Sequence, residues 1–437
     1  MNNEAPERCA AREEFSVEGV WGCCPIKRNG APVRCSVFCF RGPESIACYN
    51  LWSLSWEQRK FSDFVQRESA FRVSSSEYPS VEYEDVVAEE GRLNKDVRKK
   101  ETQKTGIIFD GTQVLYGKLR PYLHNWLNPD FSGIAVGDWW VLRPVGVDKK
   151  FLYRLIQTQQ FDEVANQSSG SKMPRADWNL VSNTEFTIPS SLDEQRQVAE
   201  TFDDLDNLIT LHQRKYDKLV NIKKSMLEKM FPRDGATVPE IRFAGFTDAW
   251  EQRKLGELVQ FSKGTGYSKG DLKESGTPII LYGRLYTKYE TEITEVDTFV
   301  DAKPGSVYSR GGEVIVPASG ETAEDISIAS VVEKSGVLLG GDLNIITLPT
   351  ELDSAFLAIS ISNGKPHNDM AKMAQGKSVV HLHNTDLEKI DLTYPSHDEQ
   401  TQISAYFRQL DNLITLHQRK LEKLKNIKKS MLEKMFV

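Results

Sequence analysis

The chain offers few residues whose types and spacing could carry out a reaction. It contains no G-x4-G-K-[ST] phosphate loop, no G-x-G-x-x-G dinucleotide turn and no G-x-S-x-G nucleophile elbow. His381 and His383 with Asp386 have the types of metal ligands, but their spacing fits the edge of a strand or a loop and no further ligand accompanies them. A polar loop is the favoured interpretation. We therefore expect no catalytic residue, no metal site and no cofactor in this chain.

The cysteines form a second group with chemical potential, and all of them lie before residue 50. A disulfide framework would need an export signal, which the N-terminus lacks. A zinc site is conceivable, but no C-x-x-C pair exists and no histidine precedes His124. The abrupt change of composition at about residue 50 indicates instead a leader that is foreign to the rest of the chain and poorly packed. The six residues are Cys9, Cys23, Cys24, Cys35, Cys39 and Cys48.

Length and charge bound the class of protein. A chain of 437 residues can form two or three domains, each with its own core. No stretch of about 18 apolar residues is present, so we expect a soluble, cytoplasmic protein without a membrane segment. The net charge of −7 argues against a generally basic surface for nucleic acid, but it leaves room for local basic patches.

The elements that must position any site are organised around a helix that occurs twice. Residues 205–231 and 410–436 are identical at 24 of 27 positions and lie 205 residues apart. Such a period is too long for a solenoid unit and indicates a tandem duplication of a whole module. We therefore expect the function to use two copies of the same kind of module.

Both copies have apolar residues at spacings of three and four, which is typical of an amphipathic helix. The net charge is −5 over 193–206 and +4 over 213–230, then −2 over 398–411 and +5 over 418–435. This polarity favours antiparallel pairing, because parallel pairing would set basic half against basic half. Two separate surface helices with solvated charges are the alternative.

The predicted pairing seam has the same seven steps in each helix. At one of these steps His212 and His417 occupy the same place, so a paired histidine contact is favoured over catalysis. The seam residues are Leu205, Leu208, His212, Tyr216, Leu219, Ile222 and Met226 in the first helix and Leu410, Leu413, His417, Leu421, Leu424, Ile427 and Met431 in the second.

Each module opens on the same WEQRK motif, at 56–60 and at 250–254, and reaches its helix through a proline-marked loop ending in Asp-Glu-Gln. Proline then ends the first helix at Pro232. We predict a leader over 1–50, a first body over 51–191, a helix over 192–231, a linker over 232–249, a second body over 250–396 and a second helix over 397–437.

The two bodies have the pattern of mixed α/β domains. In the first, 106–123 and 138–144 predict strands with turns, and 149–166 predicts a helix. In the second, 276–286, 313–320 and 336–348 predict strands, and 354–363 predicts a short helix or strand. Their sequences resemble each other only at the edges, for example at 170–172 and 376–378. The fold class is therefore α+β, with one scaffold presenting two different recognition surfaces.

Two divergent bodies, each followed by a nearly identical helix that begins with Asp-Glu-Gln and ends in KKSMLEKMF, resemble the specificity subunit of Type I restriction-modification enzymes. The resemblance covers residues 56–437, and the Cys-rich residues 1–50 depart from it. It implies two target-recognition domains that each read half of a bipartite, asymmetric site in double-stranded DNA. It also implies an antiparallel coiled coil that docks two methyltransferase subunits, with nuclease/translocase subunits added. S-adenosylmethionine and ATP are then expected on the partner subunits.

DNA contacts require donors on exposed loops that can reach phosphates and base edges. The candidates are the polar and basic clusters beside Gly or Pro in each body. They are Lys118, Arg120, Tyr122, Gln167, Ser169, Ser171, Lys172 and Arg175 in the first body and Lys263, Thr265, Tyr267, Lys269, Arg284, Gln375, Lys377 and His381 in the second. For any single member a solvated surface role is the alternative.

The resemblance leaves one other class of function open. A two-headed adaptor could bind proteins or glycans through its bodies and oligomerise through its helices, and only binding that depends on base sequence separates the two hypotheses. Under the DNA hypothesis the helix acts as a ruler. The 39 residues from Asp193 to Phe231 span about 58 Å, more than the 34–36 Å or so of one DNA turn.

Overall fold

The computed structural model describes residues 56–100, 103–167, 172–376 and 379–436, together with the backbone of three strands in the leader. Those strands, β1 (Gly22–Arg28), β2 (Ala31–Arg41) and β3 (Ile46–Asn50), pair antiparallel in the order β1-β2-β3. We predicted a poorly packed leader, and both its packing and its cysteine side chains fall outside what the structure describes. The chain forms two compact units, residues 1–209 with 423–437 and residues 210–422. No helix among the described residues is long and apolar enough to cross a membrane.

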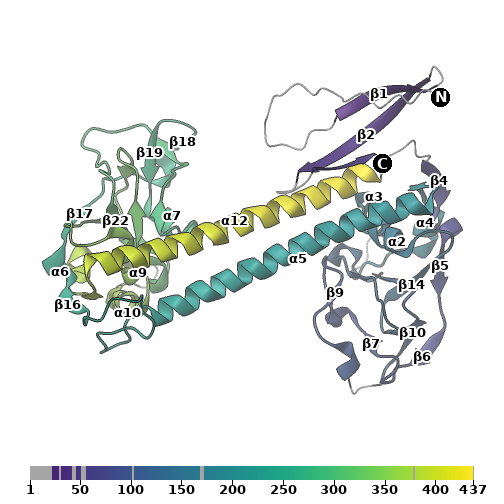
Figure 1. Cartoon of the computed structure of the whole chain (residues 1–437), viewed down its shortest axis with the longest axis horizontal. Coiled ribbons are helices and arrows are strands. Elements are labelled where there is room, and N and C mark those ends of the chain that lie inside the picture. Colours follow the sequence, from purple (N-terminus) through teal and green to yellow (C-terminus); the bar gives the residue numbers. More distant parts are fainter. Residues whose placement is uncertain are drawn as a thin grey trace, which may run out of the picture. The chain divides into compact units, whose positions relative to one another are not determined.

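The first unit contains the first body, built on two four-stranded sheets ordered β12-β11-β14-β5 and β6-β10-β13-β7 (Figure 1). Its strands are β4 (Trp56–Lys60), β5 (Val65–Glu68), β6 (Phe71–Val73), β7 (Ser80–Val81), β8 (Val86–Val87), β9 (Arg92–Leu93), β10 (Thr105–Phe109), β11 (Val114–Gly117), β12 (Trp126–Leu127), β13 (Gly133–Ala135), β14 (Trp139–Pro144) and β15 (Glu185–Pro189). Its helices are α1 (Phe61–Phe64), α2 (Lys149–Leu155), α3 (Gln159–Ala165) and α4 (Trp178–Asn183), with 3-10 turns η1 (Tyr83–Asp85), η2 (Val97–Lys99) and η3 (Pro121–Leu123).

The second unit contains the second body, whose larger sheet has the order β17-β26-β22-β24-β20 and whose smaller sheet has the order β18-β21-β19-β25. Its strands are β16 (Glu251–Lys254), β17 (Gln260–Lys263), β18 (Leu272–Lys273), β19 (Thr277–Ile280), β20 (Glu292–Ile293), β21 (Phe299–Val300), β22 (Glu313–Pro317), β23 (Ser319–Gly320), β24 (Ser330–Val332), β25 (Leu338–Leu339), β26 (Leu343–Thr347), β27 (Val380–His381) and β28 (Asp391–Tyr394). Its helices are α6 (Leu255–Leu258), α7 (Tyr282–Thr287), α8 (Ala323–Ile326), α9 (Ser354–Ile361), α10 (Gly364–Met373) and α11 (Asn384–Leu387), with one 3-10 turn, η4 (Lys269–Asp271).

The sheet that contains β5 in the first body and the five-stranded sheet of the second body, each the larger of its pair by number of strand residues, have the same strand order. Read from the strand that follows WEQRK, β5-β14-β11-β12 corresponds to β17-β26-β22-β24, and the second body adds β20 at the far edge. The smaller sheets both contain two antiparallel pairs and one parallel pair. Their connections differ, because the first body forms its edge strand β7 before β13, whereas the second forms β19 before its edge strand β25. The predicted mixed α/β class with one shared frame is therefore confirmed, and the differences collect in the smaller sheet and the loops.

The duplicated sequences form two long helices, α5 (Leu192–Lys229) and α12 (His397–Met435), which pair antiparallel as predicted. In the first unit Lys428 of α12 pairs with Asp206 of α5 at 2.7 Å. In the second unit Lys223 of α5 pairs with Asp411 of α12 at 2.5 Å, which repeats the same ion pair 205 residues later. His212 and His417 meet with 2.8 Å between their Nδ1 atoms, so the predicted histidine contact is confirmed.

The predicted seam is wrong at one step in each helix. Leu208 and Leu413 are 43% exposed, whereas the neighbouring Ile209 and Ile414 are partly buried. The physical reason is the heptad: in a paired helix the inward positions alternate by four and three, and this alternation runs from Leu205 to Ile209 and then to His212. The other predicted seam residues are buried or partly buried.

Two secondary-structure predictions also need correction. The segment 149–166 forms two helices rather than one, because the hydroxyl of Thr158 accepts from the Phe161 N–H and starts α3 as a new helix. The predicted strand over 276–286 is a strand only to Ile280, and α7 begins at Tyr282. The remaining strand predictions are confirmed, and 354–363 forms the helix α9.

Candidate nucleic-acid interface

In the first body two loops that are distant in sequence lie against each other. The chain leaves β11 through residues 118–123, and residues 172–176 return beside them after α3. Leu119 and Arg175 form an antiparallel bridge, and the Arg120 N–H donates to the Pro174 carbonyl at 2.7 Å. We call residues 118–123 with 172–176 the first junction. It brings together the predicted candidates Lys118, Arg120, Tyr122, Lys172 and Arg175.

Two residues that the sequence did not single out hold the first junction in place. The Asp138 carboxylate accepts from the Arg175 guanidinium at 3.1 Å and lies 3.5 Å from the Lys118 ammonium group. The Tyr83 hydroxyl donates to the Asp138 carbonyl and accepts from the Leu119 N–H at 3.0 Å. Burial raises the pKa of Tyr83, so its phenol stays protonated and keeps donating. Lys118 and Arg175 are therefore partly neutralised by Asp138.

Arg120 and Tyr122 are two exposed members of the first junction. Arg120 is exposed and has a φ of 50°, in the left-handed region that non-glycine residues rarely adopt. Tyr122 follows in η3 and is 52% exposed. A strained loop that ends on an exposed guanidinium and an exposed ring is suited to contact with a partner surface. A guanidinium can bond phosphate or guanine, and a ring can stack.

The second body has the corresponding arrangement with other side chains. After β22 the chain forms β23, and after α10 it returns as β27, which pairs Ser319 with His381. Gln375 also bridges His381, and the His381 ring Nδ1 lies 3.1 Å from the Ser319 hydroxyl. We call residues 319–320 with 375–376 and 380–382 the second junction. Ser319, Gln375 and His381 stand here where the first junction has Lys118 and Arg175.

The remaining candidates of the second body lie on a loop after β17. Lys263 is exposed at the end of β17, and the adjacent Ser262 carbonyl accepts from Asn384 at 3.2 Å. Tyr267 accepts from the Lys303 N–H at 2.7 Å and places its ring 4.6 Å from the Lys303 ammonium group. Thr265 accepts from the Val307 N–H at 3.1 Å. Thr265 and Tyr267 therefore hold the loop, and Lys269 stands exposed on it.

Arg284 was expected on an exposed loop, and the structure corrects this placement. Its side chain is 8% exposed in α7 and donates to Asp297 and Glu290, both at 2.7 Å. A guanidinium that is buried and doubly paired cannot leave for a ligand without exposing two carboxylates that have lost their partner. Gln167, Lys172 and Gln375 are exposed. Ser169, Ser171 and Lys377 lie outside the described residues.

The other candidate groups have local structural roles. Asp386 accepts from the His383 N–H and caps α11. No set of three His, Cys, Asp or Glu side chains in the described part of the chain could hold a metal ion. Lys149, which is not one of the predicted candidates, donates to the Pro129 carbonyl at 2.5 Å. Burial lowers the pKa of Lys149.

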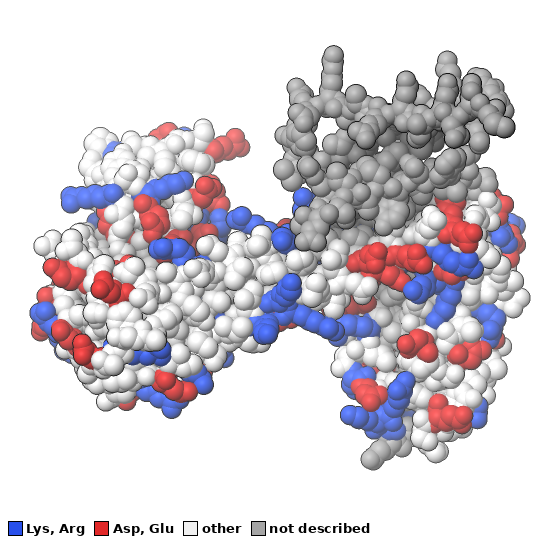
Figure 2. Space-filling view, viewed as in Figure 1, with Lys and Arg blue, Asp and Glu red and all other residues white. Residues whose placement is uncertain are grey.

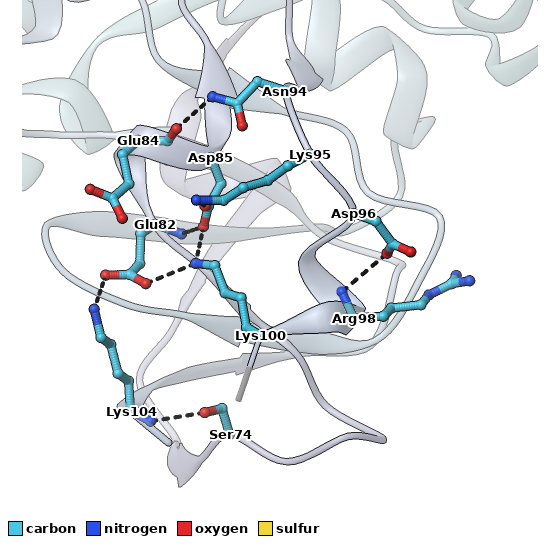
Figure 3. Close-up of polar contacts among 10 residues, drawn as sticks. All are labelled: Ser74, Glu82, Glu84, Asp85, Asn94, Lys95, Asp96, Arg98, Lys100 and Lys104. Carbon is cyan, nitrogen blue, oxygen red and sulfur yellow. Dashed lines mark hydrogen bonds and ion pairs between the residues drawn. The ribbon is translucent and has the colours of Figure 1, made fainter. Parts of the chain in front are cut away.

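The sequence reading missed a basic segment in the first body, residues 92–104 (Figure 3). Asp85 is fully buried and accepts from Lys95 at 2.9 Å and from Lys100, while Glu82 accepts from Lys100 at 2.8 Å and from Lys104. These ion pairs tie the segment to η1 and lower the pKa of Asp85, although its burial acts in the opposite direction. Six lysines and arginines between 92 and 104 were the available signal.

Arg98 and Lys99 in η2 are left for other contacts. Both are exposed and form no ion pair with the residues that the structure describes. Figure 3 shows the Arg98 guanidinium pointing away from the carboxylates of Glu82 and Asp85. Arg98 also lines a cavity of about 240 Å³ with Tyr78 and Phe131. Within the described part of this segment, Lys95, Lys100 and Lys104 are thus held by carboxylates, and Arg98 and Lys99 remain available for other contacts.

Charge is distributed in small groups on both units. On the face drawn in Figure 2, lysines and arginines alternate with acidic residues, and the described residues there form no continuous basic surface. On this face the cations are therefore grouped locally, in keeping with the net charge of −7.

Two α/β bodies on one frame, joined to a duplicated antiparallel helix pair and presenting different junctions, define a two-headed recognition protein. The family model described as the Type I restriction modification DNA specificity domain matches residues 54–221 and 247–426. The chain belongs to this family, with two copies of the domain, so the resemblance predicted from the sequence is confirmed. It is a Type I specificity subunit that recognises DNA.

Relatives agree with this assignment. The Type I restriction enzyme MjaVIII specificity subunit of Methanocaldococcus jannaschii is 22% identical over 296 residues, 65% of this chain and 68% of that protein. A crystal structure of a Type I restriction-modification S subunit from M. genitalium matches with a TM-score of 0.54 at 14% identity, over 89% of this chain and 98% of that one. A chain from a study of assembly and conformational transition of the type I R-M system matches with a TM-score of 0.51 at 17% identity, over 87% and 98%. These two likenesses show a shared fold.

Proposed function

We propose that each body reads one half of a bipartite, asymmetric site in double-stranded DNA. The observation that supports this is the pair of junctions: the same frame places Lys118, Arg120 and Arg175 in one body and Ser319, Gln375 and His381 in the other. Base edges are distinguished by the pattern of donors and acceptors that meets them. Two junctions with different donors are therefore expected to select different bases.

Exchange of one body tests this proposal. Residues 56–190 are replaced by the first body of another member of the family, and the methylated sites in the DNA of cells carrying the variant are mapped. We expect one half-site to change and the other half-site and the spacer to stay. The matched control exchanges residues 250–396 and should change the opposite half. If either exchange altered both halves, the bodies would not read independently.

We also propose that the helices dock two methyltransferase subunits through a duplicated apolar patch. Leu208 and Leu211 on α5 are 43% and 46% exposed, and Leu413 and Leu416 on α12 are 43% and 45% exposed. The surrounding sequences 205–215 and 410–420 are identical, so the chain presents the same apolar surface twice. Exposed leucines that repeat with their surroundings are typical of a docking surface rather than of isolated surface residues.

Charge placed in one patch at a time tests the docking. Leu208→Asp and Leu413→Asp should each leave a complex with one methyltransferase subunit, and the double variant a complex with none, as weighed by native mass spectrometry. Asn207→Asp and Asn412→Asp place the same charge one residue away and serve as controls. Two bound subunits in the double variant would locate the docking surface elsewhere.

The helices are also proposed to set the spacer between the half-sites. Seven residues inserted after His212 and seven after His417 preserve the heptad and lengthen each helix by about 10 Å. Since a duplex rises about 3.4 Å per base pair, the preferred spacer should grow by about three base pairs. Four residues inserted after Asn221 alone break the seam in one helix and should cost activity. Mapping of methylated sites reads both outcomes.

The chain itself is proposed to be non-catalytic, with S-adenosylmethionine and ATP bound by partner subunits and nuclease/translocase subunits completing the complex. The support is the sequence, which lacks a phosphate loop, a dinucleotide turn and a nucleophile elbow. Methyl transfer to DNA by the purified chain alone would contradict this proposal.

A further inference from the structure

The linker after α5 is anchored in the second unit by a buried ion pair. Arg242 donates to both oxygens of Glu399, with Nε–Oε1 and Nη2–Oε2 distances of 2.7 Å. Glu399 is 1% exposed and lies in the first turn of α12. The Ile241 N–H donates to the Lys229 carbonyl at the end of α5, at 2.9 Å. A two-pronged, buried guanidinium–carboxylate contact fixes orientation as well as charge.

Apolar contacts on both sides of Arg242 complete this anchor. Ile241 and Phe243 pack against a cluster that includes Trp250, Phe356 and Phe407. The Phe243 ring meets Tyr406 at 6.1 Å, edge to face. The anchor therefore recognises an extended segment of the type apolar-Arg-apolar.

The first unit contains the same cluster at the matching positions. Phe231 lies 5.7 Å from Phe356 and 6.0 Å from Trp250 in the second unit. Phe436 lies 5.5 Å from Phe151 and 6.3 Å from Trp56 in the first unit, with nearly the same angles between the rings.

The glutamine of the Asp-Glu-Gln motif is also used identically in the two units. Gln195 accepts from the Asp148 N–H and donates to the Pro189 carbonyl. Gln400 accepts from the Asp353 N–H and donates to the Pro395 carbonyl. Both the aromatic cluster and this glutamine place Glu194 at the step that Glu399 occupies.

Among the residues that the structure describes, Glu194 nevertheless has no cationic partner. Its Oε1 accepts from the Trp56 indole at 2.8 Å, and its buried Oε2 has no hydrogen-bond partner among the described residues. The residue is 4% exposed, and burial raises its pKa. Trp56 is only partly buried, whereas Trp250 is 2% exposed. In the sequence, the position eight residues before Trp56 that would match Arg242 is Cys48, and 43–55 holds no Lys or Arg.

We propose that the Glu194 carboxylate and the apolar cluster around Trp56 form a docking site for a segment of a separate polypeptide that carries arginine between two apolar residues. The segment Ile241–Phe243 shows the required chemistry. The arginine supplies the cation that Glu194 lacks, and the flanking residues cover Trp56. The position that matches Tyr406 is Thr201, so the third residue of the ligand gains less in the first unit and the arginine carries most of the selectivity. The site is separate from the two junctions and does not depend on DNA reading.

A labelled peptide with the sequence of residues 236–249, ATVPEIRFAGFTDA, tests the site on the full-length protein by fluorescence anisotropy. We expect saturable binding that weakens at least about tenfold when citrulline, which has the shape of arginine without its charge, replaces the arginine. Glu194→Gln should weaken binding by a similar factor. Asp193→Asn removes the neighbouring exposed carboxylate and should leave binding unchanged.

Hydrogen exchange provides a second readout that needs no variant. Bound peptide should slow exchange of the amides at 194–202 and leave those at 399–407 unaffected, because Glu399 already holds Arg242. Absence of saturable binding, equal binding of the citrulline peptide, or equal binding to Glu194→Gln would each overturn the proposal.

Discussion

Glu194 and Glu399 occupy the same step of the same duplicated motif and have different partners. In the first unit the carboxylate accepts from the Trp56 indole, and its other oxygen has no hydrogen-bond partner among the described residues. In the second unit Arg242 donates to both oxygens, and the buried indole N–H of Trp250 has no hydrogen-bond partner among the described residues. The two matching carboxylates therefore differ in their partners, because different segments of the chain supply the donors that reach them.

The junctions of the two bodies show the same lesson at the recognition surface. A shared strand order fixes where two loops meet, and the side chains on those loops decide what can bind there. The first junction presents cations that Asp138 partly neutralises, and the second presents a histidine held by a serine hydroxyl. Under the proposed function, the scaffold and the specificity of the chain are therefore separable.

The largest effect is expected when the paired carboxylate is removed. Glu399→Gln leaves the Arg242 guanidinium in a mostly buried place without a counter-charge, and breaking such a pair costs about 3 kcal/mol. The free energy of unfolding of the second unit should fall by about that amount, measured by hydrogen exchange of the first turns of α12. The first unit provides the internal control, since its exchange should not change. Equal loss in both units would show that the variant acts globally.

The next effect concerns the contrast between the junctions. Arg120→Ala should weaken binding of the assembled complex to its site by about 1–3 kcal/mol if the guanidinium reads a base, and the loss should be confined to the first half-site. If Arg120 contacts a phosphate, the loss of affinity is independent of base sequence. The slope of the logarithm of the binding constant against the logarithm of the salt concentration then falls by about one. Gln375→Ala makes the matched test in the second body. An Arg120→Ala complex with unchanged affinity at all salt concentrations would remove Arg120 from the interface.

These two tests separate what the sequence could predict from what it could not. The duplicated helix, its antiparallel pairing and the histidine contact follow from periodicity and charge within one segment. The burial of Arg284 could not be predicted in this way, because its partners Glu290 and Asp297 are brought to it by the fold of α7 against the next loop. The Arg242–Glu399 pair joins residues 157 positions apart, and although the Asp-Glu-Gln motif marks Glu399, no local pattern connects it to Arg242.

The error at Leu208 has a similar origin. Spacings of three and four fit both Leu208 and Ile209, and only contact with the partner helix selects between them. In the same way, the junctions could be proposed as clusters of polar residues, but Tyr83 and Asp138, which hold the first one, lie on elements with no basic or glycine-rich signature.

A smaller effect of opposite sign is expected at the unpaired carboxylate. Burial raises the pKa of Glu194, so the folded first unit binds this proton more tightly than the unfolded chain does. The contribution of Glu194 to stability is therefore most favourable below the ordinary pKa of a carboxyl group and is lost as the pH rises through the raised pKa of the folded state. Glu194→Gln removes this penalty while Gln can still accept from Trp56, and it should stabilise the first unit at neutral pH by up to about 1 kcal/mol.

The pH dependence gives the decisive comparison for Glu194. The advantage of Glu194→Gln should disappear towards pH 4, where the wild-type carboxyl is protonated. The stability difference between variant and wild type is measured by urea unfolding of the first unit at both pH values, with hydrogen exchange of residues 195–205 as the probe. A variant that is less stable than the wild type at neutral pH would mean that Glu194 has a cationic partner after all.

The smallest effect is expected where the two copies meet, at the histidine pair. Burial is the main cause that lowers the pKa of both His212 and His417, and Lys215 and Lys420 lower them further; His417 also lowers the pKa of His212. With Nδ1 atoms 2.8 Å apart, one ring must donate and the other accept, which requires at least one neutral ring. Because the folded pKa values lie below the ordinary value, the unfolded chain binds protons more readily. The contribution of the pair to stability is therefore complete above the ordinary pKa of histidine and is lost as the pH falls through it.

We thus expect the second unit to be less stable at pH 5 than at pH 8, and the double variant His212→Asn, His417→Asn to reduce this difference. The paired design matters because a single substitution would leave one ring that still titrates beside two lysines. The midpoint of thermal unfolding at the two pH values gives the difference, and NMR titration of histidine-labelled protein gives the two pKa values directly. Ring pKa values at or above the ordinary value would mean that an acidic group, rather than burial and the lysines, dominates this step of the seam. The helix pair would then hold together better, not worse, in acid.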